Sequence, residues 1–244
     1  MQILKTAGII IIGNEILSGK VQDANSFYLA SELRTLGVDV RRISVIPDEI
    51  ELIGRETVKF SELYDFVFTS GGVGPTHDDV TIAGIAAGFG VDLAENNEIR
   101  DFLCSRYKSD LNNAIIKMTM VPEGSKVIAS ENMRFPLISF RNIYIFPGIP
   151  EYIRKKFPLI REMFRSTAFN LKRLYLNCHE AEIADILNKV VEEHKDVAFG
   201  SYPILGEPDY RVIITAESKY HDHLDKSLDE LINKLPQEII VRVE

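Results

Sequence analysis

The fold is decided by the stretch YDFVFTSGGVGPTHDDVTIAGIAAGFG, residues 64–90. Residues 64–70 are apolar and aromatic enough to predict a buried strand, which runs directly into a glycine-rich loop. Residues 78–90 predict a helix, in which the many Ala and Gly residues indicate close packing against a sheet. A strand, a short loop and a helix in this order are typical of a parallel sheet covered by helices.

The same alternation of strand and helix surrounds this stretch. A β-branched run at residues 6–12 predicts a central strand, and residues 38–46 predict a second one. Helices are expected at residues 24–36, 47–62, 95–109 and 150–164, and a hairpin at residues 137–146. We therefore predict an α/β fold of three layers, in which helices cover both faces of a parallel-type sheet.

The character of the sequence changes after Ser166. The order β-α-β-β-α over residues 171–236 predicts a small α+β domain. We place a large α/β domain at residues 1–167 and this small domain at residues 168–244. Four histidines of the small domain lie among charged residues and are expected to face solvent: His179, His194, His221 and His223.

Bulk composition narrows the classes of function. Among the 244 residues, 45% are hydrophobic and 26% charged, which is ordinary for a globular protein. A formal net charge of −8 argues against a nucleic-acid partner, and no apolar run is long enough to predict a membrane span. Cys104 and Cys178 fit neither a disulfide framework nor a zinc spacing, so we expect reduced thiols and a cytoplasmic protein.

Three loops follow predicted strands and should meet at one edge of the sheet, where ligands of such folds bind. They are residues 13–19, 71–79 and 146–152. Each loop carries small or polar residues. Together the three loops predict a binding site more strongly than any one of them does.

The second loop has the features of an anion site. Positive φ and close approach of a ligand to the main chain are possible at Gly71, Gly72 and Gly74. Pro75 stiffens the exit, and Thr76 with Asp79 has the spacing of a capping box at a helix start. A tight turn with an ordinary cap is the simpler alternative, since the loop matches neither the Walker A pattern nor the dinucleotide fingerprint.

Two adjacent carboxylates follow this loop and would repel a phosphate. A divalent cation such as Mg²⁺ resolves the conflict, because it bridges carboxylate and phosphate oxygens. We take Asp78, Asp79 and Glu15 as candidate metal ligands, and Asp78, Asp79 and His77 as candidate catalytic residues. Helix capping by an aspartate and a solvent-facing His77 are the alternatives.

Further candidates for substrate binding lie on the same predicted edge. They are Ser18, Asn25, Ser26, Thr81, Pro147, Gly148 and Pro150. Capping of a helix N-terminus would also explain Asn25 and Ser26. A rigid turn that places Pro150 at the first helical position would explain the last three.

Three motifs together resemble a known family: GNEILSGKVQDANSFYLASEL (13–33), TSGGVGPTHDDVT (69–81) and FPGIPE (146–151). The sequence resembles the molybdopterin-binding-like family, which includes the MogA and MoaB proteins, the E domain of gephyrin and the N-terminal part of CinA. The Pro-Thr-His-Asp-Asp continuation resembles the branch of CinA and FAD synthase. Residues 134–151 and GSYP (200–203) are similar to the N-terminal domain of eukaryotic-type FAD synthase.

The resemblance implies a metal-dependent pyrophosphatase that hydrolyses FAD to FMN and AMP, or ADP-ribose, with Mg²⁺ or Co²⁺ and with K⁺. It leaves open a molybdopterin-binding or adenylyl-transferring protein of molybdenum-cofactor biosynthesis, or a non-catalytic regulatory module. A nucleotide or pterin partner and a homo-oligomer are expected. The chain ends at Glu244 without a synthase or amidohydrolase domain, so those activities are not expected. Asn14 stands where FAD-synthase relatives carry Asp.

Overall fold

The computed structural model describes residues 4–106, 112–128 and 135–244. The chain divides into two compact units, Met1–Ser166 and Thr167–Glu244. None of the helices in the described ranges has the length and apolar character needed to cross a membrane.

The first unit is built on a six-stranded sheet of order β2-β1-β3-β8-β7-β6. The first four strands in this order are parallel, whereas β7 and β6 continue the sheet antiparallel. The sheet is therefore mainly parallel, as predicted, and the predicted hairpin extends it. The bounds are β1 Thr6–Ile12, β2 Asp39–Ile46, β3 Phe66–Ser70, β6 Lys126–Ile128, β7 Leu137–Phe140 and β8 Ile143–Phe146.

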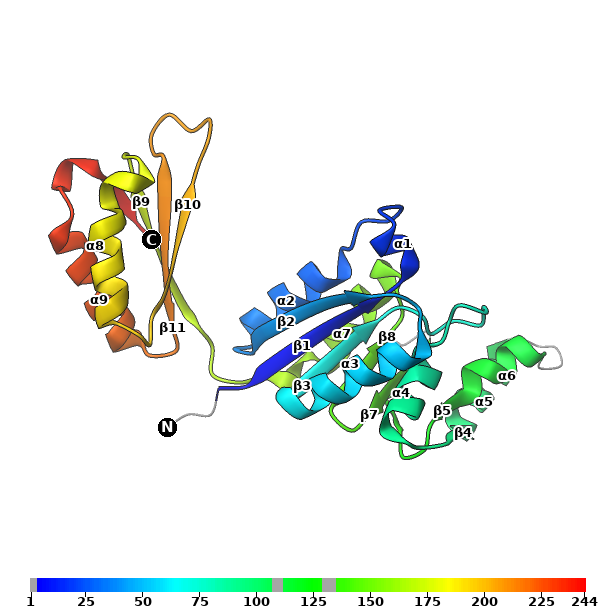
Figure 1. Cartoon of the computed structure of the whole chain (residues 1–244). Helices are drawn as coiled ribbons and strands as arrows, with labels where there is room; N and C mark the ends of the chain where they lie inside the picture. Colours follow the sequence, from blue (N-terminus) through cyan, green and yellow to red (C-terminus); the bar gives the residue numbers. More distant parts are fainter. Residues whose placement is uncertain (1–3, 107–111, 129–134) are drawn as a thin grey trace. The chain divides into compact units, whose positions relative to one another are not determined.

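Helices cover both faces of this sheet, which confirms the three layers (Figure 1). One face packs against α2 (Asn25–Thr35) and α7 (Pro150–Ile160), and the other against α3 (Ile50–Leu63), α4 (Thr81–Phe89) and α5 (Asn97–Arg106). Strand β1 feeds both cores, because Ile9 and Ile11 join the first and Ile10 and Ile12 the second. Alternation along a strand that is buried on both faces explains its unbroken apolar sequence.

The small residues of α4 pack against α3 rather than directly on the sheet. A Cβ atom on Gly54 of α3 would lie 2.8 Å from the Gly84 carbonyl oxygen and 2.9 Å from the Gly88 Cα. A Cβ atom on Gly88 would lie 2.5 Å from the Gly54 Cα. Glycine at these positions lets the backbones of α3 and α4 come into contact.

We expect Gly54→Ala to lower the free energy of unfolding by about 1–3 kcal/mol, the usual cost of overpacking. The added methyl group would meet backbone atoms of α4, which cannot move aside as a side chain can. Urea denaturation measures the change. Lys59→Ala, an exposed site on the same helix, is the control and should leave stability nearly unchanged. An unchanged midpoint for Gly54→Ala would contradict the close helix contact.

Several predicted boundaries are wrong, chiefly where helices begin. Helix α4 begins at Thr81, not at Asp78, and α3 begins at Ile50 rather than Pro47. The helix predicted for residues 150–164 ends at Ile160 and continues as a 3₁₀ turn, Arg161–Phe164. The predicted end of the helix at 95–109 lies outside the described residues. Short elements without periodicity were not predicted: α1 Asn14–Leu17, α6 Asn113–Thr119, β4 Leu93–Glu95 and β5 Met120–Pro122.

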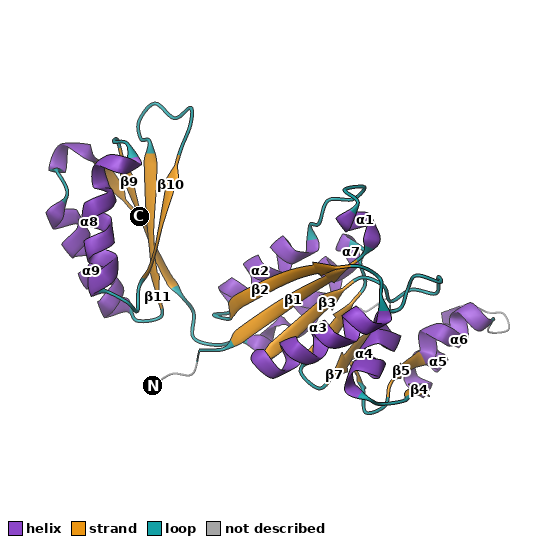
Figure 2. Ribbon diagram, viewed as in Figure 1, coloured by secondary structure: helices purple, strands orange, loops and turns teal. Residues whose placement is uncertain are grey.

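The second unit is a four-stranded antiparallel sheet of order β10-β11-β9-β12. Helices α8 (Glu180–Glu193) and α9 (His221–Lys234) pack against one face of this sheet (Figure 2). The predicted order β-α-β-β-α is correct as far as it goes, but it omits the last strand. The strand bounds are β9 Asn170–Leu176, β10 Ala198–Pro203, β11 Val212–Ser218 and β12 Ile240–Val243.

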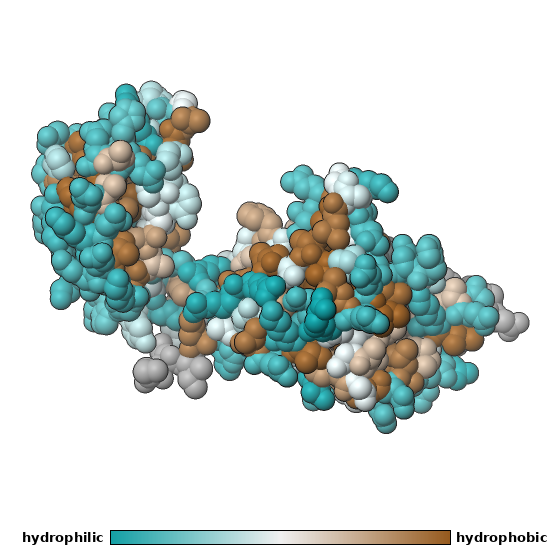
Figure 3. All heavy atoms as spheres, viewed as in Figure 1, coloured by the Kyte–Doolittle hydropathy of each residue, from teal (hydrophilic) through white to brown (hydrophobic). Residues whose placement is uncertain are grey.

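Strand β2 forms one edge of the first unit's sheet and carries apolar side chains into solvent. Ile43 and Val45 are 46% and 37% exposed. Figure 3 shows apolar side chains in the region of β1 and β2. An exposed sheet edge of this kind is available for pairing with another chain. The homo-oligomer stays a prediction, and light scattering at several concentrations tests it.

Candidate functional site

Four loops meet at one edge of the first unit's sheet, because β1, β2, β3 and β8 are parallel. The three loops predicted from the sequence follow β1, β3 and β8, and a fourth, Pro47–Glu49, follows β2. Hydrogen bonds join neighbouring loops. The Gly71 N–H donates to the Phe146 carbonyl at 3.1 Å, and the Asn14 N–H donates to the Asp48 carboxylate at 2.8 Å.

A cavity of about 780 Å³ opens between these loops and the α5–α6 part of the unit. This volume lies in the range of small-molecule sites. One part of its lining is the glycine-rich loop from Gly71 to Thr76 with Asp78 and Asp79, and another is Pro147–Pro150. The remaining walls are largely apolar: Phe102, Met118, Met120, Phe135, Ile138 and Ile145.

Glycine is required in the loop partly for reasons of packing. Gly71 has φ 116°, and a Cβ atom there would lie 1.9 Å from the Ile12 carbonyl oxygen. Gly72 has φ 62° and lies against the Thr81 hydroxyl. Within the described residues, the N–H groups of Gly72, Val73 and Gly74 donate no hydrogen bond. Three successive N–H groups without partners, in a loop that lines a cavity, can donate hydrogen bonds to an anionic ligand.

Asp79 has a different role from the predicted one. Its carboxylate accepts a hydrogen bond from the Thr76 N–H at 2.8 Å and another from the Thr76 hydroxyl. The Thr76–Asp79 spacing therefore closes a turn before the helix, and it is no capping box of α4, which starts two residues later. One oxygen of Asp79 is therefore engaged in holding the loop, and its role as a metal ligand stays a prediction.

Asp78 is the more available carboxylate. Its side chain is 59% exposed and lines the cavity. The Thr76 side chain, with His77 and Lys117 nearby, holds the pKa of Asp78 below its usual value. Lys117 of α6 donates to the Thr76 carbonyl oxygen, so a cation already lies beside the acidic loop. No pattern in the sequence pointed to Lys117, because α6 is too short to be predicted.

A hollow beside the cavity gathers oxygen ligands from three loops. Glu15 and Asp48 line both the hollow and the cavity, and Asp78 does so too. Asn14, Ser18 and the cationic Lys20 complete the polar part of the hollow. Carboxylate, amide and hydroxyl oxygens suit a hard cation such as Mg²⁺. The oxygen donors of the hollow thus suit a divalent ion, and Asp48 joins the predicted ligands Glu15 and Asp78 there.

The carboxylates of the hollow lie too far apart to hold a divalent ion as they stand. Across the described part of the chain, the only trio of acidic, His or Cys ligands within 4.8 Å of one another lies in the second unit. Glu15, Asp48 and Asp78 are therefore too widely spaced to share an ion until their side chains turn inward.

Other predicted site residues lie outside the cavity. His77 is 98% exposed and lines neither the cavity nor the hollow, which matches the solvent-facing alternative. Thr81 is buried and donates to the Gly71 carbonyl oxygen at 2.8 Å. Ser26 donates to the Asp23 carboxylate from its N–H and its hydroxyl, but it lies inside α2 and does not cap that helix, as the alternative had it. Thr81 and Ser26 thus bond to other parts of the protein, and none of the three residues lines the cavity.

Asn25 connects two of the loops from behind. Its carboxamide donates to the Ser70 hydroxyl at 3.0 Å and to the Gly148 carbonyl oxygen at 2.7 Å. Asn25 is 7% exposed. Both amide hydrogens are therefore used within the protein, and Asn25 lines neither the cavity nor the hollow. Its role as a substrate contact stays a prediction.

Lys156 is a cavity residue that the sequence did not reveal. It lies on α7 and is 6% exposed, and burial lowers its pKa from 10.5 to about 8. In the sequence it is one of two adjacent lysines in an ordinary amphipathic helix. The helix turns Lys155 toward solvent and Lys156 toward the interior.

The sequence of the large unit identifies its family. Residues 8–165 match the family described as probable molybdopterin binding domain. The chain belongs to this family. Residues 168–244 match the middle domain of FAD synthase. Both matches agree with the resemblance noted in the sequence.

Individual proteins similar to this chain support the family assignment. A protein of Archaeoglobus fulgidus is 35% identical over 228 residues, 92% of this chain and 97% of the relative. A probable FAD synthase of Caenorhabditis elegans is 31% identical over 97% of this chain, which spans about half (51%) of that synthase. The crystal structure of CinA, of unknown function, from Thermoplasma acidophilum has a TM-score of 0.62 at 29% identity, over 66% of this chain and 98% of that one.

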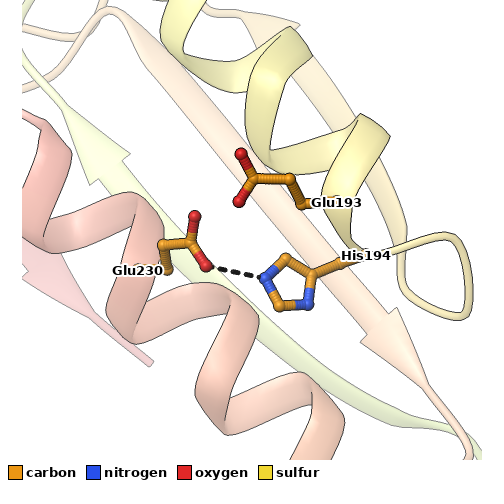
Figure 4. A group of neighbouring side chains, drawn as sticks. All are labelled: Glu193, His194 and Glu230. Atoms are coloured by element: carbon orange, nitrogen blue, oxygen red, sulfur yellow. Dashed lines mark hydrogen bonds and ion pairs between the residues drawn. The ribbon is translucent and has the colours of Figure 1, made fainter.

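The unit that follows the molybdopterin-binding domain holds a compact charged cluster, Glu193, His194 and Glu230 (Figure 4). His194 Nε2 lies 2.9 Å from a Glu230 oxygen, and Lys234 Nζ lies 2.5 Å from the other. Lys234 is also 3.6 Å from Glu193. An ammonium group thus already lies beside both glutamates, and we interpret the cluster as an ion-pair network. His194 is buried, so the prediction that it faces solvent is wrong.

This ion-pair network should make the stability of the second unit depend on pH in the acidic range. Lys234 and then His194 lower the pKa of Glu230 from 4.5 to about 2. A depressed carboxyl pKa stabilises the folded state above pH 4.5, and the contribution disappears as pH falls toward 2. We expect Glu230→Gln to lower the melting temperature at pH 7 and to reduce the loss of stability between pH 4.5 and 2. Glu192→Gln on α8 is the control, and identical acid profiles for wild type and Glu230→Gln would refute the network's role.

Proposed function

We propose that this chain hydrolyses the diphosphate bond of a nucleotide such as FAD, giving FMN and AMP, or of ADP-ribose. The observation that carries the proposal is the pairing, at one cavity, of a loop with free N–H groups and a cluster of carboxylates. The first can hold phosphate oxygens, and the second suits a divalent ion. The similarity to FAD synthases supports an enzyme that acts on FAD.

Within this proposal, the loop binds the diphosphate. The N–H groups of Gly72, Val73 and Gly74 donate to the oxygens of one phosphoryl group, and the ammonium of Lys117 offsets part of the charge. Thr76 and Asp79 keep the loop in place through their mutual hydrogen bonds. Preorganised donors of this kind stabilise charge that develops on a phosphoryl group during attack.

Glu15, Asp48 and Asp78 are the residues that would hold Mg²⁺ or Co²⁺, with K⁺ as a further requirement. A divalent ion in such a site supplies a water of lowered pKa and neutralises charge on the bridging oxygen. The chain's own part is to orient the diphosphate on the glycine loop so that its bridging bond lies beside the three carboxylates. Water adds to one phosphorus atom, and the bridging oxygen leaves with the other phosphoryl group.

Product analysis tests the proposal directly. The protein is incubated with FAD or ADP-ribose, with Mg²⁺ or Co²⁺ and K⁺, and AMP is measured by chromatography. We expect AMP from at least one substrate, and none when EDTA removes the divalent ion. Absence of AMP under every metal condition would contradict the hydrolase.

A second function is favoured by the family match of residues 8–165, namely binding of molybdopterin in cofactor assembly. It predicts tight association with a pterin and no release of AMP. The same incubations, repeated with a pterin and equilibrium dialysis, separate the two functions. A non-catalytic module predicts neither activity nor dependence on Asp78.

A further inference from the structure

Lys156 is an ammonium group buried without a carboxylate. Within the described residues, it forms no ion pair, and its hydrogen bond to the Pro136 carbonyl oxygen is long, at 3.4 Å. Its Nζ atom lies 5.2 Å from the centre of the Phe135 ring. An ammonium has three donors, so at least two hydrogens lack a good acceptor.

Burial of such a group is costly. A charge taken out of water without a partner destabilises the folded protein, and strongly buried lysines respond by a lowered pKa. The pKa of Lys156 shows this response to burial. Perturbed ionisable groups that line a cavity are often functional, and here the free donors belong to a residue of the cavity wall.

The surroundings of Lys156 differ from those of the glycine loop. Phe135 and Phe102 pack edge to face with their centres 5.8 Å apart, and both line the cavity with Lys156. Ile138 and Ile145 add aliphatic surface. This part of the wall suits a flat apolar ring better than a diphosphate. The diphosphate already has the loop N–H groups and Lys117.

We propose that Lys156 recognises the ring of the ligand, by donating from its ammonium to a carbonyl oxygen on the pyrimidine edge of a fused heteroaromatic ring. Flavins and pterins both carry this edge, whereas adenine has no carbonyl. The inference rests on the proposed function only for the placement of the diphosphate. It makes Lys156 the residue that favours a flavin- or pterin-bearing ligand over ADP-ribose.

Equilibrium binding with ring and phosphate probes tests this assignment without any need for catalysis. Riboflavin and neopterin carry the ring edge but no phosphate, and ADP-ribose carries the diphosphate but no such ring. Dissociation constants are measured by fluorescence or calorimetry for wild type, Lys156→Met and Lys156→Arg. Lys59→Met, an exposed lysine on α3, removes the same charge elsewhere.

We expect Lys156→Met to weaken the binding of riboflavin, neopterin or both by about tenfold or more, as for loss of a hydrogen bond to a charged donor. The dissociation constant of ADP-ribose should change less than about twofold. Lys156→Arg should recover part of the affinity for riboflavin or neopterin. Which ring responds identifies the source, flavin or pterin. The melting temperature of Lys156→Met shows whether this variant folds.

Three outcomes would overturn the assignment. ADP-ribose could lose as much affinity as the rings, which would make Lys156 a phosphate contact. Ring affinities could stay unchanged in Lys156→Met, or wild type could bind neither ring. Because none of these measurements involves hydrolysis, loss of AMP production alone leaves them intact, and the two proposals fail separately.

Discussion

Asp78→Asn should lower the rate of AMP release by roughly 100-fold, the size expected when one electrostatic group of an active site is removed. Asp78 is the exposed carboxylate of the glycine loop and lines both the cavity and the hollow. Asparagine keeps the shape of the side chain and removes the charge. Steady-state hydrolysis of FAD and ADP-ribose at saturating Mg²⁺ or Co²⁺ measures the loss.

The same substitution should have the opposite effect on binding in EDTA. Without a divalent ion, the Asp78 carboxylate repels a diphosphate, so the asparagine variant should bind ADP-ribose more tightly than wild type does. Asp101→Asn, an exposed carboxylate on α5, is the matched control for both measurements. Full activity of Asp78→Asn would exclude Asp78 from the site. Weaker binding in EDTA would indicate a collapsed loop instead of a lost charge.

Lys156→Met should make the first unit more stable while it weakens ring binding. Burial lowers the pKa of Lys156 from 10.5 to about 8, so the unfolded chain holds more protons between these pH values. Stability of the wild type should therefore rise by up to about 3 kcal/mol from pH 8 to pH 10.5. The methionine variant should already have this stability at pH 7, and it should lack the alkaline rise.

Urea denaturation at pH 7 to 10.5 measures this difference, with Lys59→Met as the control for lost charge. Other lysines and tyrosines titrate in the same range, so the informative quantity is wild type minus variant. A stabilising substitution that damages binding is typical of functional sites and not of packing residues. A parallel pH profile for wild type and Lys156→Met would show that the ammonium is solvated.

The sequence predicted the fold well where periodicity and strand order constrain it. The strand at residues 6–12, the hairpin turn and both helices of the second unit were found, because each has a clear apolar pattern. The last strand, β12, was missed, since four residues show no period of their own. It is formed because β9 offers an open edge.

The site was predicted less fully, because chemistry depends on where each side chain points. The sequence cannot tell which of two adjacent aspartates holds the loop in place, and the Thr76–Asp79 hydrogen bonds show that it is Asp79. Asp48 could have been found, since it follows a parallel strand as the predicted loops do. Lys156 could not, because only the packing of α7 separates it from exposed Lys155.

The carboxamide of Asn25 ties two neighbouring loops of the site to helix α2. It donates to the Ser70 hydroxyl at the end of β3 and to the Gly148 carbonyl oxygen after β8. Movement of either loop away from α2 would break one of these bonds, each worth about 1 kcal/mol. A residue that lines neither the cavity nor the hollow thus helps to fix the position of two loops that do.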